Sequence, residues 1–202
     1  MLTFDHIAVA AASLDAGVAW VEQALGVQMA GGGKHPLMAT HNRLLGMGDL
    51  YLEVIAIDPE GLPPAQPRWF DLDRFAGPPR LTNWVARTDD IDAELATAPK
   101  GTGVPLSLSR GDYRWKIAVT SEGILPFDGA YPALIQWLTP LHPTQALPEQ
   151  GVRLISMTIA HPKSEILRAA LHLNDPRIVL EDGPAKVLSA RFQTPNGERT
   201  LS

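Results

Sequence analysis

Hydrophobic and polar positions along the chain change period several times within the first sixty residues. Residues 2–10 are mostly apolar, and Ile7 and Val9 favour a strand, so a buried strand is predicted here. A helix is expected next, because Ser13 is a good N-cap, apolar side chains then recur every three or four positions, and Gly26 ends the pattern. After the glycine-rich stretch that follows, two strand-like runs flank the turn residues Gly48 and Asp49. The predicted order is β-α-β-β-β.

The same order of elements begins again further along the chain. From residue 80, "RLTNWVA" predicts a strand that leads into a short helix, and "VPLSLSR", "YRWKIAVT" and "PALIQWLTP" predict three strands. A shorter copy starts at Val152 and ends in a hairpin at Pro195-Asn196-Gly197. Tandem copies of one small unit imply sheets that pack or join side by side. The predicted domains are residues 1–58, 80–142 and 143–202, with the proline-rich residues 59–79 as a connector.

Composition narrows the class of protein. The 202 residues carry a formal net charge of −5 and no lysine or arginine cluster, so a nucleic-acid partner is not expected. The absence of cysteine removes disulfides, thiolate metal sites and cysteine nucleophiles. With no signal-peptide pattern and no apolar run of about 20 residues, we expect a cytoplasmic protein without a membrane partner.

Polar side chains interrupt the apolar strands at matching places of the two larger copies. Laying "DHIAV" over "TNWVA" places His6 over Asn83, and laying "YLEVIA" over "LIQWLT" places Glu53 over Gln136. A polar group in a buried strand needs a partner, since leaving it unpaired costs about 1–3 kcal/mol. His6 and Glu53 suit a divalent metal, and Gln136 would add a carbonyl oxygen. The alternative is that the four side chains bind one another or a ligand.

The paired units resemble the vicinal oxygen chelate superfamily, which includes glyoxalase I, extradiol dioxygenases and bleomycin-resistance proteins. More narrowly, "HNRLL", "YLEVIAIDPE", "YRWKIAV" and "ALIQW" resemble a glyoxalase-like domain family. The resemblance implies an α+β fold in which tandem βαβββ modules form curved mixed sheets around a concave site, with a shorter third βαβββ-like unit. It also implies that ligands come from the first and last strands of each module, and it admits zinc, iron, manganese or nickel. Asn83 and Gln136 depart from the usual histidine and glutamate.

Further side chains are candidates for substrate binding. His41 begins the strand that leads to Glu53, and Tyr51 shares a face with Glu53 by period-two alternation. Arg114 and Trp115 alternate on one strand, so either of them would line the hollow. We assign Asn83 to substrate binding as well, Glu53 to catalysis, and His142 to the surface.

Three functions remain open from the sequence. The leading one is a glyoxalase-like enzyme, a lyase, isomerase or dioxygenase, that acts on a small molecule at a metal held by His6 and Glu53. The second is a protein that binds or sequesters a small molecule without turnover. The third is a structural module that dimerises through exposed sheet edges. A homodimer is expected for an edge-rich protein of this size.

Overall fold

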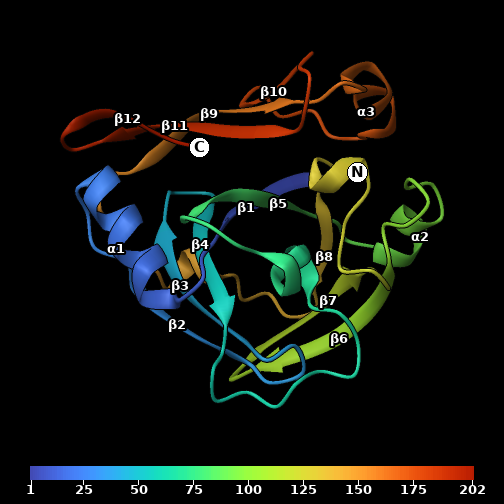
Figure 1. The fold of residues 1–202 in the computed structure, drawn as a ribbon, viewed down its shortest axis with the longest axis horizontal. Coiled ribbons are helices and arrows are strands. Elements are labelled where there is room, and N and C mark those ends of the chain that lie inside the picture. Colours follow the sequence, from blue (N-terminus) through green and yellow to red (C-terminus); the bar gives the residue numbers. More distant parts are fainter.

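The first two thirds of the chain form one curled sheet with two similar halves (Figure 1). The computed structural model describes all 202 residues. The first half consists of β1 (Thr3–Ala10), α1 (Leu14–Leu25), β2 (Ala30–His35), β3 (Thr40–Gly46) and β4 (Tyr51–Ile57). The second half consists of β5 (Arg80–Arg87), α2 (Ile91–Leu95), β6 (Val104–Arg110), β7 (Tyr113–Val119) and β8 (Ala133–Trp137).

Strand pairing makes the two halves equivalent. The sheet has the order β2-β3-β4-β1-β5-β8-β7-β6. In each half the first strand pairs in parallel with the last, β1 with β4 and β5 with β8, and the antiparallel pair β1–β5 joins the halves. The predicted α+β fold of tandem βαβββ modules around a concave face is therefore confirmed.

The last quarter of the chain forms a second, smaller sheet. It contains β9 (Arg153–Ala160), α3 (Ser164–Ala170), β10 (Ile178–Glu181), β11 (Val187–Thr194) and β12 (Gly197–Leu201). This unit has the predicted order of elements, but β9 pairs in parallel with β10 and not with the last strand. The third copy therefore shares the sequence pattern of the modules without their topology. The proposed domain boundaries and the homodimer stay predictions.

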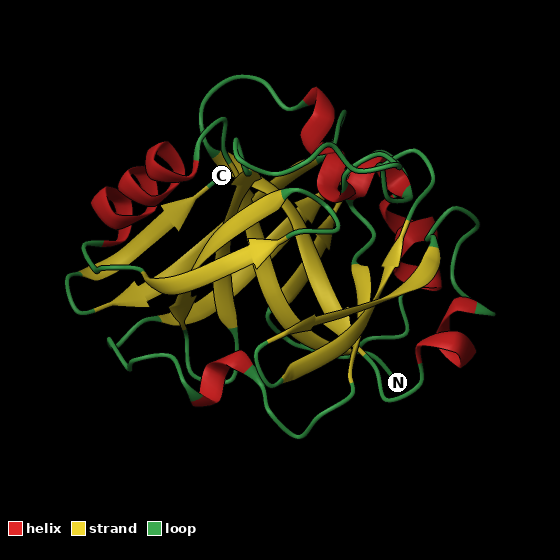
Figure 2. Cartoon of the chain, turned by 90° about the horizontal axis from the view of Figure 1, so that it is seen from below, coloured by secondary structure: helices red, strands yellow, loops and turns green.

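Side chains on the two faces of the curled sheet enter two different cores. Ile7 and Val9 of β1 pack outward, in a core shared with α1 and with the second sheet, which lies across the outer face in Figures 1 and 2. Ala8 and Ala10 point inward, where they pack with Trp115 and other apolar side chains of the hollow. Gly17 allows α1 to approach the sheet, since a Cβ there would lie 2.5 Å from Val54 Cγ1.

The connector between the modules is part of the inner core. Its kinked 3-10 segment η1 (Trp69–Arg74) lies inside the curl of the sheet, as Figure 1 shows, and Trp69, Phe70 and Leu72 are buried there. Two further short helical turns, η2 (Phe127–Gly129) and η3 (Pro143–Gln145), flank β8. The sequence predicted a linker, whereas the structure uses this segment to fill the hollow.

None of the helices combines the length and the apolar composition that crossing a bilayer requires.

Candidate functional site

His6 and Glu53 meet inside the hollow. They lie on β1 and β4, which are parallel neighbours, and both side chains point to the inner face. His6 Nε2 lies 3.6 Å from Glu53 Oε2, and both side chains are almost completely buried. They line a small cavity of about 40 Å³. The structure thus brings together the two side chains that the sequence pattern singles out, and their role stays a prediction.

A second carboxylate holds the other side of the His6 ring. A register shift in β1 between Phe4 and His6 allows Asp5, which has no solvent exposure, to reach the imidazole beside it. Asp5 Oδ1 lies 2.6 Å from His6 Nδ1. Asp5 Oδ2 lies 3.0 Å from His142 Nε2 and accepts a hydrogen bond of 3.1 Å from Trp137 Nε1. A histidine held in this way has a fixed orientation and a fixed Nδ1–H.

The two carboxylates favour the charged form of the imidazole. Burial alone would lower the pKa of His6, but hydrogen bonds to Asp5 and Glu53 outweigh it and raise the pKa to about 9. Burial would raise the pKa of both carboxyl groups. For Glu53 the hydrogen bond and charge of His6 hold the pKa below its usual value, and for Asp5 His142 and His6 do the same. The resting site is therefore an imidazolium between two carboxylates.

Asn42 and Arg110 extend this network across the open side of the curl. Asn42 Nδ2 donates to Glu53 Oε1 at 2.6 Å, and its Oδ1 accepts from Gly33 N at 2.8 Å and from Arg110 Nη1 at 3.3 Å. Arg110 comes from β6 and Gly33 from β2, the two edge strands of the sheet. A Cβ at Gly33 would lie 2.6 Å from Arg110 Cδ, so glycine is needed for the arginine to reach the site.

Aromatic rings form the walls of the cavity. Tyr51 stacks on His6 with ring centroids 4.3 Å apart, and Trp115, Trp137 and Trp69 line the remaining sides. His35, at the end of β2, also faces the cavity and packs edge-on against Trp69. Burial lowers the pKa of His35 to about 4, so that, unlike His6, it is neutral at physiological pH.

The other predicted residues divide into two groups. Tyr51 and Trp115 line the same cavity as His6 and Glu53. His41 and Arg114 do not: His41 alternates on β3 with Asn42, which does face the cavity, and Arg114 is exposed and donates to backbone carbonyls of its own hairpin. The inward arginine of this region is Arg110.

Gln136 and Asn83 also lie away from the His6–Glu53 pair. Gln136 points to the outer face, where Oε1 accepts from Ile91 N at 3.2 Å and Nε2 donates to Asp89 O at 2.6 Å, so it caps the start of α2. Asn83 lines a separate, larger cavity.

Strand register gives the reason for the position of Gln136. Ala8 pairs with Glu53 in the first half, whereas its counterpart Val85 pairs with Ala133 in the second. The counterpart of Glu53 is therefore Ala133, three residues before Gln136, and an odd shift along a strand turns a side chain to the opposite face. The expectation that Gln136 joins the site is corrected by this shift.

The donor set does not complete a divalent-metal centre. His6 and Glu53 are suitable ligands, but protein metal sites generally use three or more. On the strands of the second half that would complete the set, Val85 and Ile135 face the inner core. No group of three or more histidine, aspartate or glutamate side chains in the structure is placed to hold a metal ion. We therefore assign no chemical step to a bound metal.

Comparison with known proteins places the chain in a family. The model of the glyoxalase-like domain matches residues 4–173, most of the chain. The chain belongs to the glyoxalase-like domain family. A search of curated proteins gives no match. A hypothetical protein from Staphylococcus aureus, 14% identical, has a TM-score of 0.61 over 92% of this chain and 88% of that chain, which shows the fold alone.

Methylmalonyl-CoA epimerases are more distant structural relatives of this glyoxalase-like domain. One from Streptomyces coelicolor, in complex with 2-nitronate-propionyl-CoA, is 17% identical over 70% of this chain and 100% of that chain, with a TM-score of 0.46. One from Mycobacterium tuberculosis is 18% identical over 66% and 85% of the two chains, with a TM-score of 0.41. The superfamily resemblance inferred from the sequence is confirmed at the level of the family and the fold.

Sequence reasoning missed several residues of the site in this glyoxalase-like domain. Asp5 directly precedes His6, and alternation alone would send it to the opposite face. Asn42 lies in the "HNRLL" motif, where His41 was preferred. His142 was assigned to the surface, but its ring packs between Tyr51 and Trp137 and its Nε2 contacts Asp5. The one available signal was the adjacency of Asp5 and His6, since aspartate often orients a functional histidine.

Proposed function

We propose that the protein is an enzyme acting on a small carbonyl compound, and that its chemistry is a proton transfer between the substrate, Glu53 and His6. The buried pair supports this most directly. A carboxylate and an imidazole lie 3.6 Å apart and face a cavity, and a second carboxylate holds the imidazole at 2.6 Å. Acid–base catalysts are commonly arranged in this way, with the two partners prepared for opposite roles.

The proposed step uses both members of the pair. A substrate carbonyl oxygen that enters between them accepts the proton of His6 Nε2, while Glu53 takes a proton from the carbon beside the carbonyl. The C–H electron pair forms the C=C bond of an enol, and the carbonyl π pair moves to the newly protonated oxygen. If Glu53 returns the proton to the former carbonyl carbon while the neutral His6 takes the proton of a neighbouring hydroxyl, the product is an isomer. If a leaving group departs from the next carbon while the enol O–H proton returns to His6, the product is that of elimination. Asp5 stays ionised throughout and stabilises the charged imidazole.

The protonation states match these roles. Because its pKa is raised to about 9, His6 carries the proton that it is to donate at neutral pH. Because His6 lowers the pKa of Glu53, that carboxylate is ionised and able to accept one. Such paired proton transfers contribute about 10²–10⁴-fold to a rate.

The cavity limits what reacts there. A volume of about 40 Å³ holds a group the size of a few water molecules, since one water needs about 10–15 Å³ on this measure. The guanidinium of Arg110 at its wall favours a carboxylate or a second carbonyl on the substrate. Larger substrates require Trp69 and Phe70 of η1 to move aside.

The aromatic wall supports the second candidate, a protein that binds a small molecule without turnover. Three tryptophans, Trp69, Trp115 and Trp137, line the cavity and would hold a planar or apolar ligand. An enzyme of the proposed kind would exchange the carbon-bound hydrogen of a bound compound with the solvent, whereas a protein that only binds the compound would not.

Exchange of carbon-bound hydrogen separates the two functions. Hydroxyacetone, pyruvate and methylmalonyl-CoA are incubated with the protein in D₂O, loss of the α-C–H signal is followed by proton NMR, and binding is followed by quenching of tryptophan fluorescence. We expect at least one compound to bind and to exchange. The exchange rate should fall at least 100-fold in Glu53→Gln and should be unchanged by a chelator. Saturable binding without exchange in the wild type would instead support sequestration.

A matched variant controls for the fold. Glu60→Gln removes an exposed carboxylate outside the cavity and should leave the exchange rate as in the wild type. Equal loss of exchange in both variants, or exchange retained in Glu53→Gln, would contradict the role given to Glu53.

A further inference from the structure

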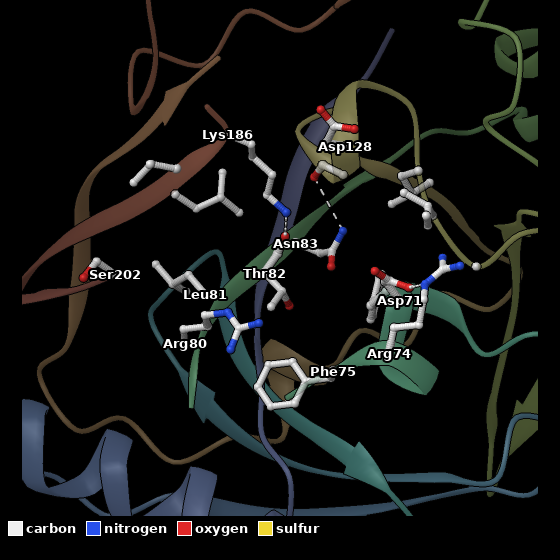
Figure 3. Close-up of a pocket in the computed structure, with 17 residues that line it drawn as sticks. Asp71, Arg74, Phe75, Arg80, Leu81, Thr82, Asn83, Asp128, Lys186 and Ser202 are labelled. Carbon is white, nitrogen blue, oxygen red and sulfur yellow. Dashed lines mark hydrogen bonds and ion pairs between the residues drawn. The ribbon is translucent and has the colours of Figure 1, made fainter. Parts of the chain in front are cut away.

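A second cavity, larger than the first, lies on the other side of η1. It has a volume of about 380 Å³, and Phe70 lines both cavities, so the connector separates them. Its walls come from β5, η1, η2 and the loop before β11 (Figure 3). The proton transfer proposed above uses none of its polar side chains.

Lys186 brings a positive charge into this cavity without a negative partner. Its side chain is largely withdrawn from solvent, and Nζ donates a hydrogen bond of 2.6 Å to Thr82 O, a neutral backbone acceptor. No salt bridge involves this lysine. Burial lowers its pKa to about 8, and the charge of Arg80 acts in the same direction, whereas the charges of Asp128 and Asp71 oppose the shift without cancelling it.

Arg80 is a second cation without a carboxylate partner. Its guanidinium donates to the backbone oxygens of Ala76 and Pro78 and lies 4.3 Å from the ring centroid of Phe75. Figure 3 shows Lys186 and Arg80 reaching toward the same space from different walls. Lys186 and Arg80 are both partly buried, and a cation withdrawn from water is normally paired, so two cations without a carboxylate partner at one cavity favour an anionic ligand.

The acidic residues nearby do not supply that anion. Asp71 is already paired with Arg74, with Oδ1 2.6 Å from Nε. Asp128 is 84% exposed in its side chain and lies 3.6 Å from His161 Nε2.

Neutral donors complete the site. A Cβ at Gly129 would lie 3.1 Å from both Asn83 Nδ2 and Lys186 Nζ, so these two nitrogens converge on one spot. Thr82 Oγ1 is buried at the cavity wall with no hydrogen-bond partner. Phe70, Asp71 and Asp128, which also line the cavity, adopt φ values of 56–59°, a strained conformation that is frequent at ligand sites.

We propose that this cavity binds the oxyanion of a small molecule, a carboxylate or a phosphate, between Lys186 and Arg80, with the amide of Asn83 as a neutral donor. The site is separate from the His6–Glu53 pair, so it stands or falls independently of the proposed enzyme activity.

Titration with inorganic phosphate and with acetate tests the proposal. Binding is measured by calorimetry at constant ionic strength with chloride as the reference anion. The variants are Lys186→Met, Arg80→Gln and the control Lys100→Met, which removes an exposed lysine. We expect millimolar or tighter binding of at least one anion by the wild type and by the control. The Kd should weaken at least tenfold in Lys186→Met and in Arg80→Gln, and Lys186→Arg should retain binding within about threefold.

Thermal unfolding without added anion distinguishes this role from a structural one. Removing an unpaired, desolvated charge should leave the Tm of Lys186→Met equal to or above that of the wild type, whereas a lysine needed for folding would lower it. Absence of anion binding by the wild type, or binding retained in both Lys186→Met and Arg80→Gln, would overturn the proposal.

Discussion

The two halves of the curled sheet have the same topology but different inner faces. In the first half, β1 and β4 present His6 and Glu53 to the hollow, and Asp5 and Asn42 support them. In the second half the corresponding strands present apolar side chains, among them Val85 and Ile135. The repeated topology of the two halves therefore forms the hollow. The residues at a few inward positions differ between the halves, and these differences place polar side chains on one side of the hollow only.

This asymmetry explains why the site contains a charged pair and not a ring of ligands. A metal surrounded by both halves would need donors on all four central strands. The first half alone provides two, His6 and Glu53, which already form an ion pair with each other, and His6 is also held by Asp5.

Asp5→Asn should be the most damaging single change. The substitution removes the charge that His6 and His142 both contact, in a position with no solvent exposure. Breaking a buried charge pair costs about 3 kcal/mol or more, so the free energy of unfolding in urea should fall by that amount. Asp112→Asn, at an exposed turn, should change it by less than about 0.5 kcal/mol. A loss below about 1 kcal/mol in Asp5→Asn would show that Asp5 does not anchor the site.

The titration of the His6 ring should be visible in the pH dependence of the free energy of unfolding. Its pKa is raised from 6.5 in the unfolded chain to about 9 in the fold, so its contribution is complete below pH 6.5 and is lost as pH rises toward 9. At 1.36 kcal/mol for each pKa unit, the free energy of unfolding should decline by about 3 kcal/mol across this range. In His6→Gln the decline should disappear. An equal decline in both proteins would assign it to another group.

His35 should act in the opposite direction at acid pH. Its pKa is lowered from 6.5 to about 4 in the folded protein, so between these two pH values His35 is protonated in the unfolded chain and neutral in the folded protein. The folded state should therefore lose stability as pH falls from 6.5 to 4, again by up to about 3 kcal/mol. His35→Gln should flatten this acid limb in urea unfolding and leave the His6 limb unchanged.

A donor added to the second half should create the metal site that the first half lacks. Ile135 lines the same cavity as His6 and Glu53, so Ile135→His would supply a third ligand. Cobalt binding, followed by visible absorbance, should tighten at least 100-fold, equivalent to about 2.7 kcal/mol. The double variant Ile135→His, His6→Gln should bind as weakly as the wild type. No gain in Ile135→His would mean that the two halves do not face one another across the cavity.

Gln136→Ala should have the smallest effect. It removes hydrogen bonds to Ile91 N and Asp89 O at the start of α2, on the outer face, worth about 1 kcal/mol in the free energy of unfolding. The pKa of His6 should not change. A shift in that pKa would contradict the placement of Gln136 outside the site.

The sequence predicted the fold better than the site because the two depend on different information. The spacing of apolar residues and the repeated order of elements identify the modules. His6 and Glu53 are candidate site residues because they are polar, potentially ligating side chains in apolar strands. Period-two alternation does not show which face of a strand points inward. In the pairing of β5 with β8, the counterpart of Glu53 is Ala133, three residues before Gln136, so Gln136 lies on the opposite face. Two further residues of the site were missed for related reasons. Asp5 reaches the site through a register shift in β1, and Arg110 reaches it because the two edges of the sheet approach each other.

The most direct test of the central claim is an NMR titration of the His6 ring in isotopically labelled protein. The account predicts that His6 titrates at about pH 9 in the wild type, and that its pKa falls by roughly one unit or more in Glu53→Gln, where the neighbouring charge is gone. A His6 pKa at or below 6.5, or one that does not respond to Glu53→Gln, would contradict the charged pair on which the proposed chemistry depends.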